Sequence, residues 1–414
     1  MNKSGNKERS IMTKTILIIG TLDTKGLEFA YLRDLIQARG HKTIVLDAGV
    51  NGEPGFPPDI SAEEVAKTGG ASLLELRQKA DRGFALDVMS KGAREITGKL
   101  YEEGKIDGVI SLGGSGGTSI ATTAMQALPV GLPKVMVSTM ASGNVAPYVD
   151  VKDITMMYSV VDVAGLNSLS RKIFANAVGA ICGMVEQEVT PAEDKPLITA
   201  TMFGVTTPCV TMVREGLEKR GFEVLVFHAT GSGGRSMEAL ISAGFISGVA
   251  DITTTEWCDE LVGGVLSAGP ERLDAAAKAG VPQVVSLGAL DMVNFGAMET
   301  VPEQFKHRTL YKHNASVTLM RTTAQENAEL GRIIATKLNQ TRVPTALFIP
   351  LQGVSMIDAP GQPFHSPEAD QALFAAIREH LDTSKVELIE MPNHINDPEF
   401  AEAMTLKLTE MLAK

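Results

Sequence analysis

The chain has 414 residues and a formal net charge of −11, from 38 Lys+Arg against 49 Asp+Glu, and 44% of its residues are hydrophobic. This length exceeds the size at which a single hydrophobic core usually stops growing, so we expect two domains. The negative charge and the scattered basic residues argue against nucleic-acid binding, and the lack of any apolar run of about 18 residues argues against a membrane span.

The N-terminus and the cysteines bear on where the protein acts. Residues 1–14 lack the apolar core of a secretory signal, so we expect a disordered tail. Cys182, Cys209 and Cys258 match neither a zinc-site spacing nor a disulfide framework. A reduced, cytoplasmic protein is the simplest interpretation.

The first half of the chain alternates apolar runs with amphipathic patterns. After the first run, Leu27, Tyr31 and Leu35 recur every four residues beside Leu32 and Ile36, which predicts a helix with one buried stripe that stops at Gly40. Continuous apolar strands between such helices indicate a parallel sheet covered on both faces. The predicted strands of this half are residues 15–20, 42–49, 106–114 and 134–139.

An acidic stretch divides the chain. It contains two prolines and lacks a clear period, so it predicts the boundary between a domain at 15–185, a linker at 186–196 and a second domain at 197–414. The second domain continues with apolar runs and a closing amphipathic helix, at residues 244–257, 281–291, 316–323, 345–353 and 399–413. We therefore expect an α/β protein with two consecutive Rossmann-like doubly wound domains and mainly parallel sheets.

The loop after the first predicted strand, GTLDTKG, has residue types that suit an anion. Asp23 and Thr24 are good residues for a helix start, where backbone N–H groups point outward with partial positive charge. Lys25 adds a full positive charge suited to a phosphate. An ordinary capped turn with Lys25 in solvent explains the loop equally well.

A second loop, GGSGGTS, follows the predicted strand at 106–114. Its glycines let backbone amides approach a polyanion, and its hydroxyl groups can donate hydrogen bonds. It matches neither the dinucleotide fingerprint nor the P-loop. A tight turn needs one glycine or two, so we predict anion binding, with close packing of two chain segments as the alternative. The residues concerned are Gly113, Gly114, Ser115, Gly116, Gly117 and Thr118.

Two further residues could complete this first site. Arg82 could reach the same crevice, although a surface charge on a helix explains it as well. Asp47 ends the second predicted strand, where an acidic side chain can hold a ribose hydroxyl. A turn-forming aspartate is the alternative for that position.

The second domain has polar loops of its own, including a second Gly/Ser-rich loop with Arg235. A histidine, carboxylates and an arginine could serve as base, acid and anion anchor, although polar residues at strand ends also serve as loop caps. No histidine has zinc-site spacing, so no protein metal site is expected, only Mg²⁺ accompanying a nucleotide phosphate. The candidate catalytic residues are Asp251, Glu256, Asp291, His313 and Arg321.

A Ser-His-Asp triad is not expected. Ser115 lies between a strand and a helix, and GGSGG fits the nucleophile-elbow pattern by letter. The only histidine of the first domain, His41, precedes that serine, so the chain order of such a triad is missing.

Several long motifs carry a family resemblance. GTLDTKGLEF, DRGFALDVMSKGA, SLGGSGGTSIATTAMQALPVGLPKVMVSTMASG and SVVDVAGLNSLSRKIFANAVGAICGM in the first half, with FGVTTPCV, HATGSGGRSME, LGALDMVNFG and MIDAPGQPFHSPEAD in the second, span almost the whole chain. They closely resemble an ATP-binding family that contains the tomato mosaic virus resistance (replication inhibitor) protein and many uncharacterised bacterial proteins.

The resemblance implies ATP and Mg²⁺ in the first domain and a homodimer. Carried over by matching positions, the nucleotide site falls on Asp23, Thr24, Lys25 and the Gly113–Gly116 stretch, and also on Arg82 and Asp47. In the plant member a barrel-like region follows, which this chain lacks, so any activity of that region would need a separate barrel-fold partner protein.

Three function classes remain open. The leading hypothesis is an ATP-binding protein with a two-domain cleft, in which ATP drives chemistry on a small anionic metabolite. The second is a non-catalytic, nucleotide-regulated binding module. The third is an ATP-independent acid/base enzyme that acts on a small sugar acid or carbonyl compound in the second domain.

Overall fold

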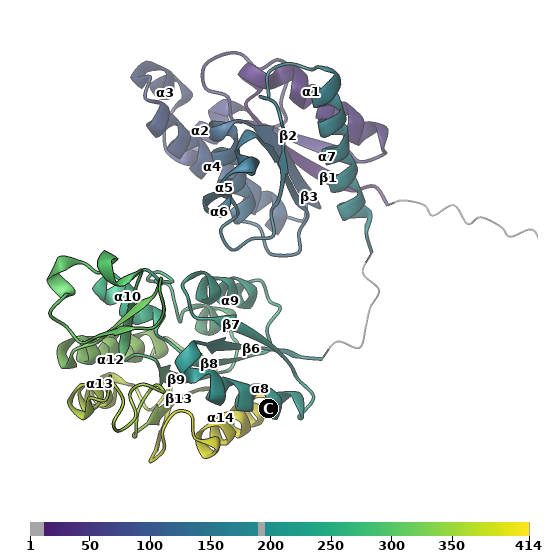
Figure 1. Ribbon diagram of the computed structural model, residues 1–414. Coiled ribbons are helices and arrows are strands. Elements are labelled where there is room, and N and C mark those ends of the chain that lie inside the picture. The colour runs from purple at the N-terminus through teal and green to yellow at the C-terminus, as the bar shows by residue number, and fades with distance from the viewer. Residues whose placement is uncertain (1–11, 189–194, 414) are drawn as a thin grey trace, which may run out of the picture. The chain divides into compact units, whose positions relative to one another are not determined.

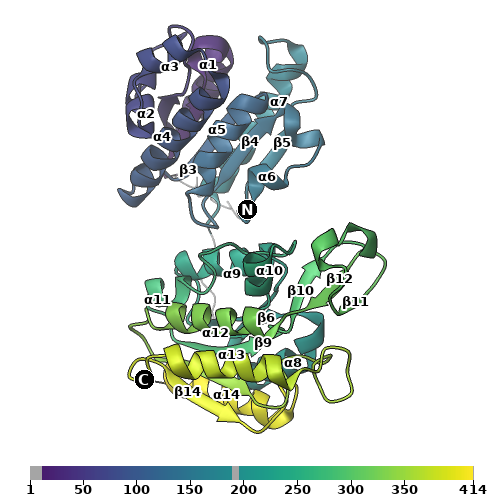
Figure 2. The same ribbon diagram turned by 90° about the vertical axis from the view of Figure 1, so that its left-hand side faces the viewer.

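A computed structural model describes residues 12–188 and 195–413 of the chain. Most of the predicted N-terminal tail, residues 1–11, and the middle of the predicted linker lie outside the described residues. The chain divides into two compact units, residues 1–190 and 191–414. Each unit is an α/β layer structure with a parallel sheet between helices (Figures 1 and 2).

The first unit contains a five-stranded sheet in the order β2-β1-β3-β4-β5. All neighbouring strands are parallel. This is a doubly wound order, in which the chain changes direction across the sheet between β1 and β3. The strands are β1 (Thr15–Gly20), β2 (Lys42–Asp47), β3 (Gly108–Gly113), β4 (Lys134–Ser138) and β5 (Thr155–Tyr158).

Helices cover both faces of this sheet. Alternate residues of β1 point to opposite faces: Leu17 and Ile19 contact one helical layer, and Ile16 and Ile18 contact the other. The first layer contains α2 (Ala62–Gly69), α3 (Leu73–Lys79), α4 (Arg82–Glu102) and α5 (Ser115–Gln126). The second contains α1 (Leu22–Ala38) and α7 (Ser168–Glu186); a 3₁₀ turn, η1 (Thr139–Ser142), and the short helix α6 (Ala146–Val149) follow β4.

The buried stripe of α1 agrees with the predicted one in part. Leu32 and Ile36 are buried as expected, together with Leu22 and Phe29, whereas Leu27 is 72% exposed. Leu32 and Ile36 share a face with Phe29, and Leu27 lies on a neighbouring face of the helix. The predicted stop is confirmed: Gly40 has φ 88° directly after the helix.

The second unit contains a six-stranded parallel sheet in the order β14-β13-β9-β8-β6-β7. From β7 to β13 this order repeats that of the first unit. The strands are β6 (Leu197–Met202), β7 (Glu223–His228), β8 (Gly248–Thr253), β9 (Gln283–Gly288), β13 (Thr345–Pro350) and β14 (Glu387–Met391).

Helices again cover both faces. On one face lie α8 (Thr207–Glu218) and α14 (Pro398–Leu412). On the other lie α10 (Glu256–Val262), α12 (Ala324–Leu338) and α13 (Pro367–His380), with α9 (Ser232–Ser242) and α11 (Ala275–Ala279) in a smaller adjoining cluster.

The apolar run predicted at 316–323 does not join the main sheet. It forms β12 (Thr318–Arg321) of a three-stranded antiparallel sheet, between β10 (Met292–Phe295) and β11 (Leu310–Lys312). A short apolar run indicates a strand buried on both faces, but it does not indicate whether the adjacent strands are parallel or antiparallel. The sequence pattern therefore could not predict this antiparallel sheet.

The sequence also led to expectations about the cysteines and about membrane-spanning helices. The three cysteines are buried and free of disulfides. Across residues 12–188 and 195–413, no helix has the length and apolar character needed to cross a membrane.

The backbones of α2 and α4 pack very closely in one helical layer of the first unit. A Cβ placed on Gly92 would lie 1.9 Å from the Val65 carbonyl oxygen, and one on Gly69 would lie 2.0 Å from that of Val88. These backbones can approach so closely only without side chains.

Gly92→Ala should therefore lower the free energy of unfolding by at least about 1–3 kcal/mol, the usual range for an overpacked core. Gly98→Ala, on the same helix, meets no atom within 4 Å and should instead add up to about 1 kcal/mol through helix propensity. Urea unfolding of both variants checks this. Equal stabilities would contradict the close α2–α4 contact.

Candidate functional site

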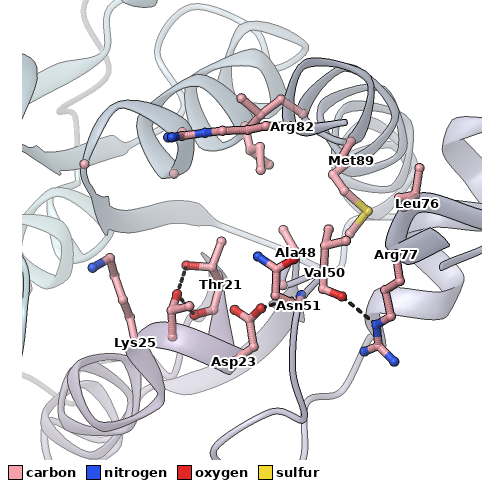
Figure 3. Close-up of a pocket in the computed structure, with 18 of the residues that line it drawn as sticks. Thr21, Asp23, Lys25, Ala48, Val50, Asn51, Leu76, Arg77, Arg82 and Met89 are labelled. Atoms are coloured by element: carbon pink, nitrogen blue, oxygen red, sulfur yellow. Dashed lines mark hydrogen bonds between the residues drawn. The ribbon is translucent and has the colours of Figure 1, made fainter. Parts of the chain in front are cut away.

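A pocket of about 540 Å³ lies beyond the carboxyl ends of β1, β2 and β3 in the first unit. This is the point where the strand order changes direction, and ligands of open α/β sheets bind at such points. Four segments line it, as Figure 3 shows in part: residues 21–25, 48–51, 76–89 and 114–120. The two loops that the sequence analysis selected therefore face the same pocket.

The N-terminus of α5 opens into the pocket. Gly114 is the N-cap residue and makes no side-chain capping bond. The first backbone N–H with an acceptor in the helix is that of Thr118, which bonds the Gly114 carbonyl at 2.9 Å. The N–H groups of Ser115, Gly116 and Gly117 precede it and have no acceptor within the helix. Together with the helix dipole they favour an anion.

The glycines of this loop are not explained by the fold. None of Gly113, Gly114, Gly116 and Gly117 has a positive φ. A Cβ on Gly114, Gly116 or Gly117 would lie 3.8, 3.4 and 3.6 Å from its nearest neighbour, which is ordinary contact. Only Gly113 packs closely, with a Cβ 3.2 Å from the Gly117 Cα. The alternative of close chain packing thus accounts for one glycine of four.

The Gly/Ser-rich loop of the second unit, which follows β7 and leads into α9, behaves differently. There Gly231 has φ 81°, a Cβ on Gly233 would lie 1.8 Å from the His228 carbonyl oxygen, and one on Gly234 would lie 2.2 Å from a Glu256 carboxylate oxygen. Backbone conformation and packing require these glycines. Glycines that the fold itself requires therefore differ from Gly114, Gly116 and Gly117 in backbone conformation or in packing distance.

Three cations line the pocket, Lys25, Arg77 and Arg82, of which Lys25 and Arg82 were expected from the sequence. Lys25 lies where α1 departs from helical geometry, with φ −132° and ψ 29°, and its ammonium group donates to the Val163 carbonyl. Arg82 begins α4, and its guanidinium lies 3.8 Å from the position of a Gly116 Cβ. Within the described ranges Arg82 makes no hydrogen bond or ion pair, so its charge is available to a ligand.

One wall of the pocket is apolar. Figure 3 shows Leu76, Met89 and Val50 on the side away from Lys25 and Thr21. The apolar lining residues are Ala48, Val50, Leu76, Ala80, Ala85, Leu86, Met89 and Ile120. The pocket therefore has a cationic, amide-rich part and an apolar part.

Some residues predicted for this site lie behind it. The Asp47 carboxylate is buried and accepts hydrogen bonds from the N–H groups of Leu22 at 3.0 Å and Gly49 at 2.8 Å. Burial raises the pKa of this carboxyl, and the two N–H groups oppose that shift. Asp47 thus fastens α1 to the loop after β2. Thr118 is also buried, donates to the Gly114 carbonyl and bonds Ser138.

The structure brings most of the other predicted residues together. Those that line the pocket are Asp23, Thr24, Lys25, Arg82, Gly114, Ser115, Gly116 and Gly117, while Gly113, Asp47 and Thr118 support it from outside. Sequence reasoning missed the loop residue Asn51 and Arg77 of α3. Neither residue stands in a recognisable motif. Their position at the pocket depends on how the chain runs from β2 to α3, which the sequence pattern does not show.

In the second unit, Asp251 and Glu256 surround a buried arginine. Arg272 is 1% exposed and donates to Asp251, Glu256 and Glu238. Glu256 also accepts the N–H groups of Gly231 at 2.7 Å and Gly234 at 3.1 Å. Its carboxylate occupies the start of α9, so this loop carries its own anion.

Asp291 and Arg321 belong to a separate buried group. Arg321 donates through one nitrogen to Asp358 at 3.1 Å and Asp370 at 2.7 Å, and Asp291 accepts from Ser355 at 2.7 Å. Burial is the largest cause that raises the pKa values of the three carboxyls, which repel one another across the single guanidinium.

His313 lies apart from these groups. It is exposed in the turn between β11 and β12, at the opposite end of β12 from Arg321. The five residues predicted to be catalytic therefore fall into two buried networks and one exposed turn. Among the described residues, no group of three or more His, Cys, Asp or Glu side chains could hold a metal ion.

Comparison with known proteins shows relatives along the whole chain. Residues 14–190 match the N-terminal domain, and residues 195–412 the C-terminal domain, of an uncharacterised protein family (UPF0261). A UPF0261 protein of Clostridium tetani is 59% identical over 404 residues, 97% of this chain and 100% of that protein. One of Rhizobium meliloti is 50% identical over 391 residues, 94% of this chain and 97% of that protein.

A plant relative matches in part. The ToMV resistance protein Tm-1(GCR237) of Solanum lycopersicum is 44% identical over 340 residues, which are 80% of this chain and 45% of that protein. The resemblance predicted from the motifs is thereby confirmed as to family. Neither the family description nor the names of these relatives give a ligand.

The buried carboxyls around Arg321 make local stability depend on pH. A carboxyl with a raised pKa keeps its proton in the folded protein, while the unfolded chain releases it above an ordinary pKa of about 4. Stability is then lost as pH rises from about 4 through the raised folded-state pKa. Titratable neighbours of the group include Cys258, Glu326 and His365.

We expect peptides covering residues 353–370 to lose protection from hydrogen exchange between pH 5 and pH 8, after correction for intrinsic rates. Peptides covering residues 197–202 of β6, which contain no titratable side chain, serve as the internal control. Protection that stays constant, or rises with pH, would contradict the assigned direction of the pKa shifts.

Proposed function

The chain belongs to the UPF0261 family, and from that premise we propose that its first unit binds ATP in the pocket beyond β1, β2 and β3. The observation that carries the proposal is the α5 loop. Three of its glycines have neither a positive φ nor a packing neighbour that excludes a side chain. Backbone kept bare without a structural reason is expected where a ligand must approach it closely.

The two parts of the pocket fit the two parts of a nucleotide. The α5 amides with Lys25 and Arg82 provide donors and positive charge for phosphates. The apolar wall of α3 and α4 suits a base. The volume of about 540 Å³ lies within the range of about 300–1,000 Å³ typical of small-molecule sites.

Mg²⁺ fits as a companion of the phosphates rather than as a resident ion. It is usually held by one or two carboxylates together with the phosphates of the ligand. Asp23 supplies one carboxylate at the pocket, and its Oδ1 has no hydrogen-bond partner among the described residues. The bound ion would neutralise phosphate charge, with Asp23 as its protein ligand.

The proposal is for binding and does not assign catalysis to the second unit. Asp251, Glu256, Asp291 and Arg321 are buried and bonded to one another or to neighbouring groups. Such side chains hold loops in place. A nucleotide-binding module is therefore favoured over the acid/base enzyme considered from the sequence.

Lys25→Ala should weaken ATP binding. Hydrogen bonds to charged groups contribute about 1.5–3 kcal/mol, and about 1.4 kcal/mol corresponds to tenfold in affinity. Isothermal titration calorimetry with Mg²⁺ present should therefore show a loss of roughly ten- to a hundredfold. Lys91→Ala, on α4 away from the pocket lining, is the matched control. No ATP binding by the wild-type protein, stripped of bound ligand, would refute the proposal.

Gly116→Ala distinguishes an effect on ATP binding from an effect on protein stability. The added methyl group meets only ordinary contacts, and alanine favours a helix over glycine by up to about 1 kcal/mol. The melting temperature should stay unchanged or rise. ATP affinity should nevertheless fall by about tenfold or more, because the methyl group occupies the ligand's approach to the amides. A variant that keeps full affinity would remove the observation on which the proposal rests.

A further inference from the structure

The loop after β2, residues 48–52, is held at successive positions along its length. The Ala48 N–H donates to the Gly20 carbonyl at 2.7 Å, and the Gly49 N–H donates to Asp47 at 2.8 Å. The Asn51 N–H donates to Asp23 Oδ2 at 2.9 Å. The end of β1, the end of β2 and the first turn of α1 therefore all position this loop.

Arg77 of α3 completes the attachment from the other side. Its Nε donates to the Val50 carbonyl at 2.6 Å, and its Nη2 donates to the Gly52 carbonyl at 3.1 Å. These two carbonyls flank Asn51. The planar guanidinium makes both bonds at once, a geometry that a lysine ammonium cannot reproduce. Arg77 is thus engaged with backbone, in contrast to Arg82, which has no such partner.

The side chain of Asn51 is left for a ligand. Asn51 is exposed, and its side-chain amide makes no hydrogen bond to a residue in the described part of the chain. Figure 3 shows it beside Asp23 and Ala48, with Lys25 on one side and Met89 and Leu76 on the other. An amide offers a donor and an acceptor together, which suits the edge of a base or the hydroxyl groups of a sugar.

We propose that Asn51 recognises the nucleoside part of the ligand and that Arg77 is the positioning residue that presents it. This rests on the proposed nucleotide site and divides it into two functions. The α5 amides, Lys25 and Arg82 take the phosphates. The loop after β2, clamped by Arg77 and Asp23, distinguishes a nucleoside triphosphate from inorganic triphosphate.

The test compares ATP with inorganic triphosphate, each with Mg²⁺, by isothermal titration calorimetry on the full chain. Asn51→Ala should lower ATP affinity by about tenfold, which corresponds to the loss of about one hydrogen bond. It should leave triphosphate affinity unchanged. Arg77→Ala should also lower ATP affinity and leave triphosphate affinity unchanged, because Arg77 positions the loop and does not itself contact the ligand. Lys25→Ala is the reference variant that weakens both ligands.

Arg77→Lys distinguishes a clamp from a charge. If Arg77 positions the loop, lysine keeps the charge, loses the paired carbonyl bonds and lowers ATP affinity selectively. If Arg77 instead anchors phosphate, Arg77→Ala weakens triphosphate as well and Arg77→Lys restores it, which would overturn the proposal. Thermal melting of each variant, with and without triphosphate, shows whether the pocket still forms.

The two proposals fail in different ways. Wild-type protein that binds neither ligand refutes the nucleotide site itself. Wild-type protein that binds both ligands equally tightly, or an Asn51→Ala variant with unchanged ATP affinity, refutes only the assignment of the loop after β2. Selective loss of ATP in both the Asn51 and the Arg77 variants supports it.

Discussion

The start of a helix leaves backbone N–H groups without acceptors, and each unit of this protein has to satisfy that constraint beyond a glycine-rich loop. The second unit does so internally: Glu256 accepts the N–H groups of Gly231 and Gly234, and Arg272 balances its charge. Among the described residues of the first unit, no carboxylate accepts the N–H groups at the start of α5. The N–H groups of Ser115, Gly116 and Gly117 open into a pocket instead. The two glycine-rich helix starts, one after β3 and the other after β7, are thus an open and a closed solution to the same constraint.

The open version depends on packing at some distance from it. Arg82 begins α4, and α4 packs closely against α2 through Gly69 and Gly92, where backbone carbonyls of the facing helix leave no room for a side chain. On the other side, Asp47 fastens the first residue of α1 to the loop after β2. Asp47 is 2% exposed, so this attachment is made inside the fold, and the burial raises the pKa of its carboxyl. The pocket is therefore a consequence of the layer contacts.

Local sequence patterns predicted features that depend on neighbouring residues, such as strands and helix ends. Apolar runs located β1 to β4 of the first sheet and β8, β9 and β13 of the second, and Gly40 ended α1 as expected. They did not mark the edge strands β5 and β14. The two loops that line the pocket were recognisable because each follows a strand directly and each combines residue types suited to an anion. Leu27 was misassigned, since a four-residue spacing fits two neighbouring faces of one helix and only the sheet decides which is buried. The extra antiparallel sheet could not be seen, because pairing direction leaves no mark in a short apolar run.

Site residues were hardest to predict where their partners are distant in sequence. Asp251 and Glu256 looked like free acids at strand ends until Arg272 was found between them. Asp291 and Arg321 looked like an acid and an anchor, yet Arg321 is bound to Asp358 and Asp370, 37 and 49 residues away. A polar residue after a strand has two possible fates, to meet a ligand or to meet another segment of its own chain. Three glycines of one loop, Gly114, Gly116 and Gly117, have neither a positive φ nor a neighbour that excludes a side chain, so packing within the chain does not account for this loop of the first unit.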